Sequence, residues 1–243
     1  MEALKRILLP ASKKCIDWLY PLRCPVCDDV APSGTAVCPE CLVKLHRVGE
    51  NFCLKCGKAL TGQEAECCPD CVNGRHLFEQ GRSLYIYEGE LRSSLYRMKY
   101  ARRGEYAGFY AEQMVRYLGE WIRRTDAGGI APVPISKKRQ KERGYNQAAL
   151  LAEKVSERTG IPLYEDLVLR IRDTAPQKNL DAMQRQNNLK KAFKIGRNDV
   201  KLNRLILIDD IYTTGATADA VTTVLRQSGI GKVYVLTLAI GRQ

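Results

Sequence analysis

Eight of the ten cysteines form four C-x-x-C pairs, and this repeat constrains the fold more than any other feature of the chain. Ten, eleven and eleven residues separate successive pairs, which are Cys24/Cys27, Cys38/Cys41, Cys53/Cys56 and Cys68/Cys71. Each C-x-x-C turn supplies two thiolates from one tight knuckle, and a tetrahedral zinc ion takes four. The repeat therefore predicts two structural zinc sites.

Other uses of these cysteines fit the sequence less well. Disulfides belong to oxidising compartments, and the first apolar run is cut short by Pro10 and the pair Lys13 and Lys14, so an export signal is not expected. A redox pair would need one C-x-x-C beside a βαβ unit. Four thiolates leave no open position for a substrate, which excludes catalytic zinc. We expect a cytoplasmic protein without membrane insertion, because every apolar run is too short to span a bilayer.

The sequence leaves the grouping of the knuckles open. Consecutive knuckles could share a zinc ion, or the first could join the third. Cys67 is adjacent to Cys68 and could replace it, but Cys68 completes a C-x-x-C with Cys71 and is therefore favoured. Cys15 lies outside the repeat among apolar residues, where packing is the expected role.

Charge and cysteine content divide the chain near residue 80. Residues 1–80 hold ten basic residues, ten acidic residues and all ten cysteines. Residues 81–243 hold 29 basic and 17 acidic residues, which accounts for the whole net charge of +12. We predict three parts: an amphipathic segment over 1–22, a small double zinc-ribbon module over 23–78, and a larger domain over 79–243.

Strand and helix patterns alternate in the larger part of the chain. Strands are predicted over 82–87, 128–135, 167–171, 192–195, 204–208 and 233–240. Helices are predicted over 104–124, from an N-cap at Asn146 to Gly160, and over 217–227 with Gly229 at the C-terminal cap. This alternation predicts an α/β fold, with a mainly parallel sheet and helices on both faces.

The segment LILIDDIYTTGAT, residues 205–217, predicts a ligand site. Its apolar strand runs into Asp209 and Asp210, and a loop of small residues leads into a helix. Open α/β sheets bind ligands at the carboxyl ends of their strands, and backbone N–H groups at a helix N-terminus bind phosphate. Carboxylates repel phosphate but accept hydrogen bonds from sugar hydroxyls. Together the loop and the acids predict a site for a ribose 5-phosphate.

Competing types of nucleotide or phosphate site match this segment less well. A P-loop lysine and a G-x-G-x-x-G motif are both absent from it. An aspartyl-phosphate enzyme would leave the loop without a role. A solvated aspartate pair in an ordinary turn is the structural alternative.

Three segments together resemble one family. LILIDDIYTTGAT is similar to the phosphoribosyl pyrophosphate (PRPP) signature of type I phosphoribosyltransferases. The segments PVPISKKRQKERGYNQAALLA (132–152) and QKNLDAMQRQNNLKKAF (177–193), together with the four knuckles, resemble the ComF family of competence-associated proteins. The resemblance implies a type I phosphoribosyltransferase-like fold that binds PRPP with Mg²⁺. It also implies a role in DNA uptake during natural transformation, with single-stranded DNA and a competence helicase as partners.

The resemblance assigns roles to individual residues. The acids that hold the ribose hydroxyls match Asp209 and Asp210, the candidate catalytic residues. The 5-phosphate loop matches Thr213, Thr214, Gly215, Ala216 and Thr217. The pyrophosphate loop matches Ile135, Ser136 and Lys137, with Mg²⁺ carried on the pyrophosphate. A hood that closes over substrate matches residues 172–191.

One position departs from the pattern of relatives in purine salvage, which carry an aspartate where Thr213 stands. A threonine cannot act as a general base near neutral pH. The resemblance therefore disfavours purine salvage, and it leaves open whether the chain is an enzyme.

A surplus of positive charge favours contact with nucleic acid. Residues 92–197 contain 23 basic and 11 acidic residues. The densest basic run supplies the candidate nucleic-acid residues Lys138, Arg139, Lys141 and Arg143. Four tyrosines lie among basic residues and could stack on single-stranded bases: Tyr96, Tyr100, Tyr106 and Tyr145. Half of them are expected in the core, because helical spacing accounts for positions such as Tyr106 equally well.

Three alternatives to this function stay open. The basic run could be a solvated loop. The chain could be a metabolic phosphoribosyltransferase with an unidentified base or amine acceptor. It could also be a non-catalytic adaptor that docks a partner through its zinc module and senses PRPP.

Overall fold

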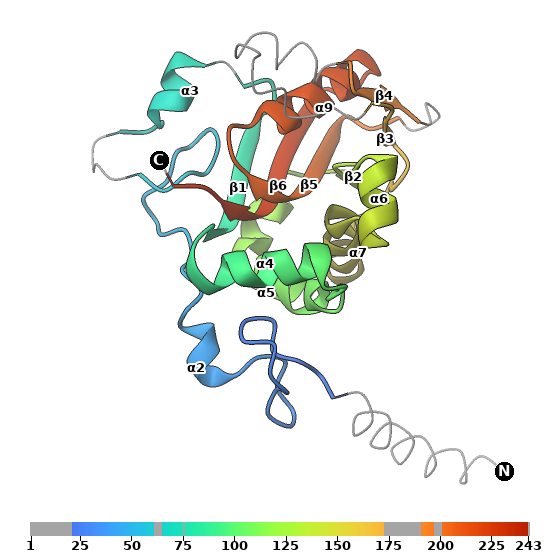
Figure 1. The fold of residues 1–243 in the computed structure, drawn as a ribbon. Helices are drawn as coiled ribbons and strands as arrows, with labels where there is room; N and C mark the ends of the chain where they lie inside the picture. The colour runs from blue at the N-terminus through green and yellow to red at the C-terminus, as the bar shows by residue number, and fades with distance from the viewer. Residues whose placement is uncertain (1–20, 61–64, 75, 173–190, 197–200, 243) are drawn as a thin grey trace, which may run out of the picture.

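A parallel sheet forms the centre of the computed structural model, which describes residues 21–60, 65–74, 76–172, 191–196 and 201–242. Within these ranges the sheet has four strands in the order β1-β6-β5-β2. They are β1 (Gln80–Ile86), β6 (Lys232–Ile240), β5 (Arg204–Tyr212) and β2 (Gly129–Pro132). All three pairings are parallel. β5 thus lies inside the sheet, as the sequence predicts (Figure 1).

Helices cover both faces of this sheet. On one face, α4 (Gly89–Tyr100), α5 (Tyr106–Arg124) and α7 (Gln147–Thr159) share a core with Ile206 and Ile208 of β5. On the other face, α9 (Ala216–Gln227) shares a core with Leu205 and Leu207. Because alternate residues of a strand point to opposite faces, β5 contributes to both cores. The predicted α/β architecture is confirmed.

Local sequence accounts for the ends of α7. The side chain of Asn146 accepts a hydrogen bond from the backbone N–H of Ala148 (3.1 Å), which caps the first turn. Gly160 ends the helix in the left-handed conformation, at φ +74°. Between these caps Leu151, Ala152 and Val155 are fully buried. The apolar positions predicted from the sequence are thus the positions that face the core.

Two predicted strands lie outside the main sheet. β3 (Val168–Arg170) and β4 (Phe193–Ile195) pair with each other in an antiparallel, two-stranded sheet. This small sheet packs on the side of α9, where Val168 and Phe193 are buried. Both strand predictions are confirmed, but strands of three residues are too short for their pattern to indicate which sheet they join.

Two helices differ from the sequence prediction. α4 was not predicted, and the basic run treated as a loop forms α6 (Lys137–Arg143). The hydroxyl of Ser136 caps α6 by accepting the N–H of Arg139 (3.3 Å), and Gly144 ends the helix at φ +84°. Smaller differences concern α9, which starts at Ala216 and is capped by Ser228, with Gly229 one residue later.

Loops pair with both edges of the sheet. Along β1, the N–H of Ile86 donates to the carbonyl of His46 (2.8 Å), and the N–H of Val48 donates to that of Leu84 (2.9 Å). Along β2, Ile130 exchanges two backbone hydrogen bonds of 2.8 Å with the segment 162–164. Free backbone N–H and C=O groups on an edge strand can pair with another chain. The two segments form hydrogen bonds with some of these groups on β1 and β2.

The cysteine-rich part of the chain packs on both faces of the sheet. Cys24, Cys38 and Cys41 are buried in the core of α4 and α5, together with Leu236. Cys53, Cys56 and Cys68 are buried with Val235, which precedes Leu236 in β6 and points to the opposite face. In Figure 1, α2 (Pro39–Leu42) accordingly lies near α4 and α5, and α3 (Pro69–Asn73) lies at the other side of the sheet.

Some predictions concern residues that the structure does not describe. These are most of the segment 1–22, Cys15, most of the hood 172–191 and residues 177–190 of the ComF-like segment. The division at residues 78 and 79 stays a prediction. In the described ranges, none of the helices is both long and apolar enough to cross a membrane.

Candidate functional site

Consecutive knuckles form two cysteine quartets. In each quartet, the four Sγ atoms lie within 4.8 Å of one another, and the members are Cys24, Cys27, Cys38 and Cys41 in the first and Cys53, Cys56, Cys68 and Cys71 in the second. Four sulfurs bound to zinc at about 2.3 Å would lie about 3.8 Å apart. The Sγ atoms of Cys27 and Cys38 are 3.9 Å apart, and those of Cys56 and Cys68 are 3.6 Å apart. The geometry therefore fits zinc, and it brings Cys68 rather than Cys67 into the second quartet.

Backbone groups of the knuckles favour the thiolate form of one cysteine in each quartet. Burial acts to raise the pKa of Cys24, but hydrogen bonds from nearby backbone N–H groups outweigh it and lower that pKa to about 7. The same balance lowers the pKa of Cys53 to about 6. Because metals bind thiolates, these N–H groups prepare each quartet for zinc near neutral pH.

The acid pair lies where β5 extends beyond β2. The last pairing of β2 joins Pro132 to Ile208, whereas β5 continues beside β6 as far as Tyr212. The strand is thus four residues longer than the sequence predicts, and Asp209 and Asp210 stand where one of its edges is no longer paired with β2. The chain leaves β2 towards α7 and leaves β5 towards α9, on opposite faces of the sheet, and such a point is the usual ligand crevice of an open α/β sheet.

The two carboxyl groups have different surroundings. Asp210 forms an ion pair with Lys99 of α4, with 2.6 Å between Oδ2 and Nζ, and both side chains are less than a fifth exposed. Asp209 accepts the backbone N–H of Asp210 at 2.8 Å. Burial, together with the negative charge of Asp210, holds the pKa of Asp209 well above the usual aspartate value. The Asp209 carboxyl group therefore keeps its proton to a higher pH than an ordinary aspartate does.

The predicted phosphate loop leads from β5 into α9. Thr213 and Thr214 are exposed, and Gly215 adopts φ +78° as the N-cap of α9. Ala216 and Thr217 begin the helix, where backbone N–H groups have no partner within the helix and carry partial positive charge. A small cavity is lined by Asp209, Gly215 and other residues of this region: Thr213, Thr217 and Val133. The loop and Asp209 therefore line one cavity.

The predicted pyrophosphate residues follow β2 at the same end of the sheet. Val133 donates its N–H to the carbonyl of Ile208 (2.8 Å) and accepts a hydrogen bond from the side chain of Asn146 (2.9 Å). Beyond it, Ile135 is partly buried, Ser136 caps α6 and Lys137 is the exposed first residue of that helix. Pairing of β2 with β5 thus places both halves of the predicted site on neighbouring strands.

The candidate nucleic-acid residues divide into exposed and internal positions. Lys138, Arg139 and Lys141 are exposed on α6. Arg143 is buried, donates to the side chain of Gln147 (2.7 Å) and lies over the ring of Tyr100. Its guanidinium therefore anchors α6 to the protein, in contrast to the predicted contact with nucleic acid.

The four tyrosines divide in the same way. Tyr96 and Tyr100 of α4 are 63% and 57% exposed, and their ring centroids are 4.8 Å apart. Tyr106 is buried and donates to Asp28, and Tyr145 donates to the carbonyl of Met98 (2.6 Å). Tyr96 and Tyr100 thus expose ring surface to a ligand, although Arg143 also contacts Tyr100, and the other two tyrosines have structural roles.

The cysteine-rich region, residues 15–72, matches the family described as a double zinc ribbon domain. Competence protein F of Haemophilus influenzae is 39% identical over 112 residues, which is 45% of this chain and about half (49%) of that relative's length. Competence protein ComFC of Bacillus subtilis is 28% identical over 79% of each chain. The resemblance to the ComF family is confirmed.

A second group of ComF-like relatives is named for the use of DNA. The DNA utilization protein YhgH of Salmonella typhi is 28% identical over 212 residues, which cover 86% of this chain and 92% of that protein. Among solved structures, the glutamine PRPP amidotransferase of B. subtilis matches 46% of this chain and 22% of its own, with 21% identity and a TM-score of 0.33.

Four residues of this region were not predicted from the sequence. Lys99 of α4 forms the ion pair with Asp210. His76 forms hydrogen bonds with Tyr212 and Asp219, which precede and follow the phosphate loop in the sequence. The spacing of Leu91, Leu95 and Met98, all buried in α4, is a helical signal that could have placed Lys99 on a helix. The contacts themselves join residues more than a hundred positions apart and leave no local pattern.

Asp209→Asn is expected to raise the free energy of unfolding at pH 7. The raised native pKa means that the native protein binds more protons than the unfolded chain between pH 4 and the native pKa of Asp209. The wild type therefore gains stability as the pH falls through that range, whereas the variant has no such group. The advantage of the variant should vanish near pH 4 and grow as the pH rises, until it becomes constant above the native pKa, in urea unfolding curves measured from pH 4 to pH 8.

The matched control is Asp126→Asn, which changes a carboxylate that is 84% exposed and paired with Arg204 at the other end of β5. Its effect should stay within about 0.5 kcal/mol at every pH. A loss of stability in Asp209→Asn at pH 7, or a gain that does not depend on pH, would contradict the account of this carboxyl group.

Proposed function

We propose that the carboxyl end of β5 binds PRPP, with Mg²⁺ carried on its diphosphate. The observation that carries this proposal is the single cavity lined by Asp209 and by the loop that begins α9. The acid pair is suited to the ribose hydroxyls, and the first N–H groups of α9 are suited to the 5-phosphate. The segment after β2, with Ser136 and Lys137, is suited to the diphosphate.

Lys99 belongs to this proposed site as a partner of the acids. Two neighbouring carboxylates in a partly buried site repel each other, and the ammonium group 2.6 Å from Asp210 offsets that repulsion. Burial and the charge of Asp210 raise the pKa of Asp209, and the charge of Lys99 opposes that rise. The pair therefore presents its carboxyl oxygens to a diol beside a fixed ammonium group.

Ribosyl transfer is a proposal that depends on an acceptor. Thr213 offers no carboxylate to a nucleobase, so a purine acceptor is disfavoured, and a base or amine of another class would be required. Without an acceptor, the same site would serve a protein that senses PRPP.

We further propose that this protein binds single-stranded DNA during uptake of DNA on the cytoplasmic side of the membrane, together with a competence helicase. The names of the ComF-like relatives support the process. The exposed tyrosine pair on α4 and three exposed basic residues on α6 support the surface, because bases stack on aromatic rings while lysine and arginine contact phosphates. α4 and α6 are in contact with each other, so the two features lie on adjoining helices.

PRPP is expected to bind with a dependence on Mg²⁺ that the variant Asp209→Asn/Asp210→Asn loses. Neutral amides accept hydrogen bonds less strongly than carboxylates, and the loss of the carboxylate at position 210 would also release Lys99 from its ion pair. Calorimetric titration of the purified protein measures the affinity, with Asp126→Asn as the matched control that should bind like the wild type. Absence of PRPP binding to the wild type, or equal binding to the double variant, would refute the proposed site.

Single-stranded DNA is expected to bind with an affinity that falls steeply with salt. Tyr96→Ala and Tyr100→Ala should each cost about 1–3 kcal/mol of binding free energy, the range for stacking on one base. Lys138→Gln/Lys141→Gln should reduce the slope of log K against log salt by about 1.4, since each phosphate contact with a single strand contributes about 0.7. Fluorescence anisotropy with a labelled oligonucleotide measures both.

The matched control for the tyrosine variants is Tyr117→Ala, which removes an exposed ring from α5 instead. It should bind DNA like the wild type. Weak DNA binding near physiological salt, or equal losses in all three tyrosine variants, would contradict the proposed DNA surface. PRPP binding with no DNA binding would favour a metabolic enzyme or an adaptor.

A further inference from the structure

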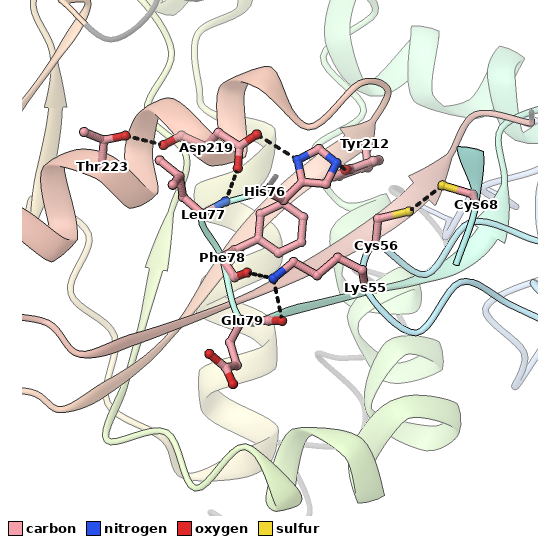
Figure 2. A network of polar contacts seen from close by, with 10 residues as sticks. All are labelled: Lys55, Cys56, Cys68, His76, Leu77, Phe78, Glu79, Tyr212, Asp219 and Thr223. Carbon is pink, nitrogen blue, oxygen red and sulfur yellow. Dashed lines mark hydrogen bonds and ion pairs between the residues drawn. The ribbon is translucent and has the colours of Figure 1, made fainter. Parts of the chain in front are cut away.

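A buried histidine lies between the second cysteine quartet and the phosphate loop. The side chain of His76 is 9% exposed, and that of Asp219, its partner in the first turn of α9, is 6% exposed. Figure 2 shows His76 between Asp219 and Tyr212, with its Nδ1 2.8 Å from Asp219 Oδ2 and its Nε2 3.2 Å from the Tyr212 hydroxyl. Neither ribose nor phosphate binding, as proposed above, uses this histidine directly.

Hydrogen bonds connect the carboxyl group of Asp219 to two neighbours. The carboxylate of Asp219 accepts the backbone N–H of Leu77 (2.8 Å) on one oxygen and His76 on the other. Nδ1 of His76 shares a hydrogen bond with this carboxyl group, and Nε2 shares one with the hydroxyl of Tyr212. Both ring nitrogens of His76 thus have a hydrogen-bond partner, which fixes the orientation of the imidazole ring.

This ring packs directly against the backbone of the phosphate loop. A methyl group added to Gly215 would lie 2.6 Å from Cε1 of His76 and 2.4 Å from the hydroxyl of Tyr212, so only a glycine fits there. The N–H of Asp219 donates to the carbonyl of Gly215 (2.8 Å) in the first turn of α9. The group thus contacts the loop at its start (Tyr212), at its end (Gly215) and one turn into the helix (Asp219), while Thr213 and Thr214 stay exposed between these anchors.

The second cysteine quartet holds this group from the other side. His76 stacks on Phe78, with ring centroids 4.9 Å apart. Phe78 is fully buried in the same cluster as Tyr212 and three cysteines of the quartet. Lys55, inside the knuckle of Cys53 and Cys56, donates to the carbonyls of Phe78 and Glu79. The second cysteine quartet therefore fixes the segment that carries His76.

We propose that His76 is a positioning residue for the phosphate loop, and that the second zinc ribbon sets the loop's conformation through His76 and Phe78. This inference rests on the proposed phosphate site. His76 acts through the backbone of Gly215 and the hydroxyl of Tyr212, without contact with the phosphate. Its loss should therefore affect ligands held by the loop and spare ligands held by the segment after β2.

Two ligands separate these effects: ribose 5-phosphate, which requires the loop, and inorganic pyrophosphate with Mg²⁺, which requires the segment with Ser136 and Lys137. Calorimetry with the full zinc-loaded chain should show that His76→Leu weakens ribose 5-phosphate about tenfold, a loss typical of residues that orient a ligating group. The affinity for pyrophosphate should change less than twofold. His76→Asn retains a donor near the position of Nδ1 and should recover part of the loss.

Tyr212→Phe provides a second test, because it removes one hydroxyl and keeps the buried ring. It should also weaken ribose 5-phosphate selectively, and it carries the test if His76→Leu does not fold with two zinc ions per chain. Unchanged binding of ribose 5-phosphate in the folded variants, or equal losses for both ligands, would overturn the inference while the proposed site stands. If the wild type binds no ribose 5-phosphate, the proposed site fails, and the inference fails with it.

Discussion

Two cysteine quartets packed on opposite faces of one small sheet are the constraint on which the rest of this structure depends. Each quartet fits a zinc ion, whose binding would fix two knuckles at a time. The first quartet is buried in the core of α4 and α5, and the second is buried with Tyr212 and Val235. The segment that joins them pairs with β1 and covers that edge of the sheet. The zinc ribbons are therefore part of the core of the α/β fold.

Each quartet supports one half of the proposed site. Beside the first, Arg97 of α4 donates to the backbone carbonyls of Pro25 and Val26, within the first knuckle. Two residues later, Lys99 of the same helix reaches Asp210. Beside the second, His76 holds Gly215. A partly buried acid pair is costly to fold, and the two ribbons supply rigid surroundings for that pair and for the loop at Gly215.

The sequence allowed the elements with a strong local signal to be predicted. The knuckles follow from spacing, α7 from its caps and periodicity, and the place of the acid pair near the end of β5 from the apolar strand before it. The grouping of the knuckles could not be predicted, because spacing alone permits consecutive or alternate pairs. Arg143 was predicted to contact nucleic acid, because a run of charged residues does not indicate which of them face inward on a helix. In the structure, Ser136 and Gly144 cap α6, and Arg143 lies on its inner side.

Tertiary contacts account for the remaining differences. β5 continues past Ile208 because β6 stays paired with it as far as Tyr212, and β6 is distant in the sequence. The same holds for Lys99 with Asp210 and for His76 with Asp219, which pair residues from opposite halves of the chain. Polar partners of a site are thus the part of it that one sequence reveals least, since neither periodicity nor composition records them.

The central claim, that zinc ribbons and ligand site form one unit, is tested most directly by zinc release during heating. An indicator dye would report zinc while circular dichroism reports unfolding, with and without PRPP and Mg²⁺. A ligand that binds only the native state stabilises everything that unfolds with it. The account predicts that zinc release and unfolding share one midpoint and that PRPP raises both equally, although it contacts no cysteine. Zinc release at a lower temperature that PRPP does not change, while the unfolding midpoint rises, would contradict it.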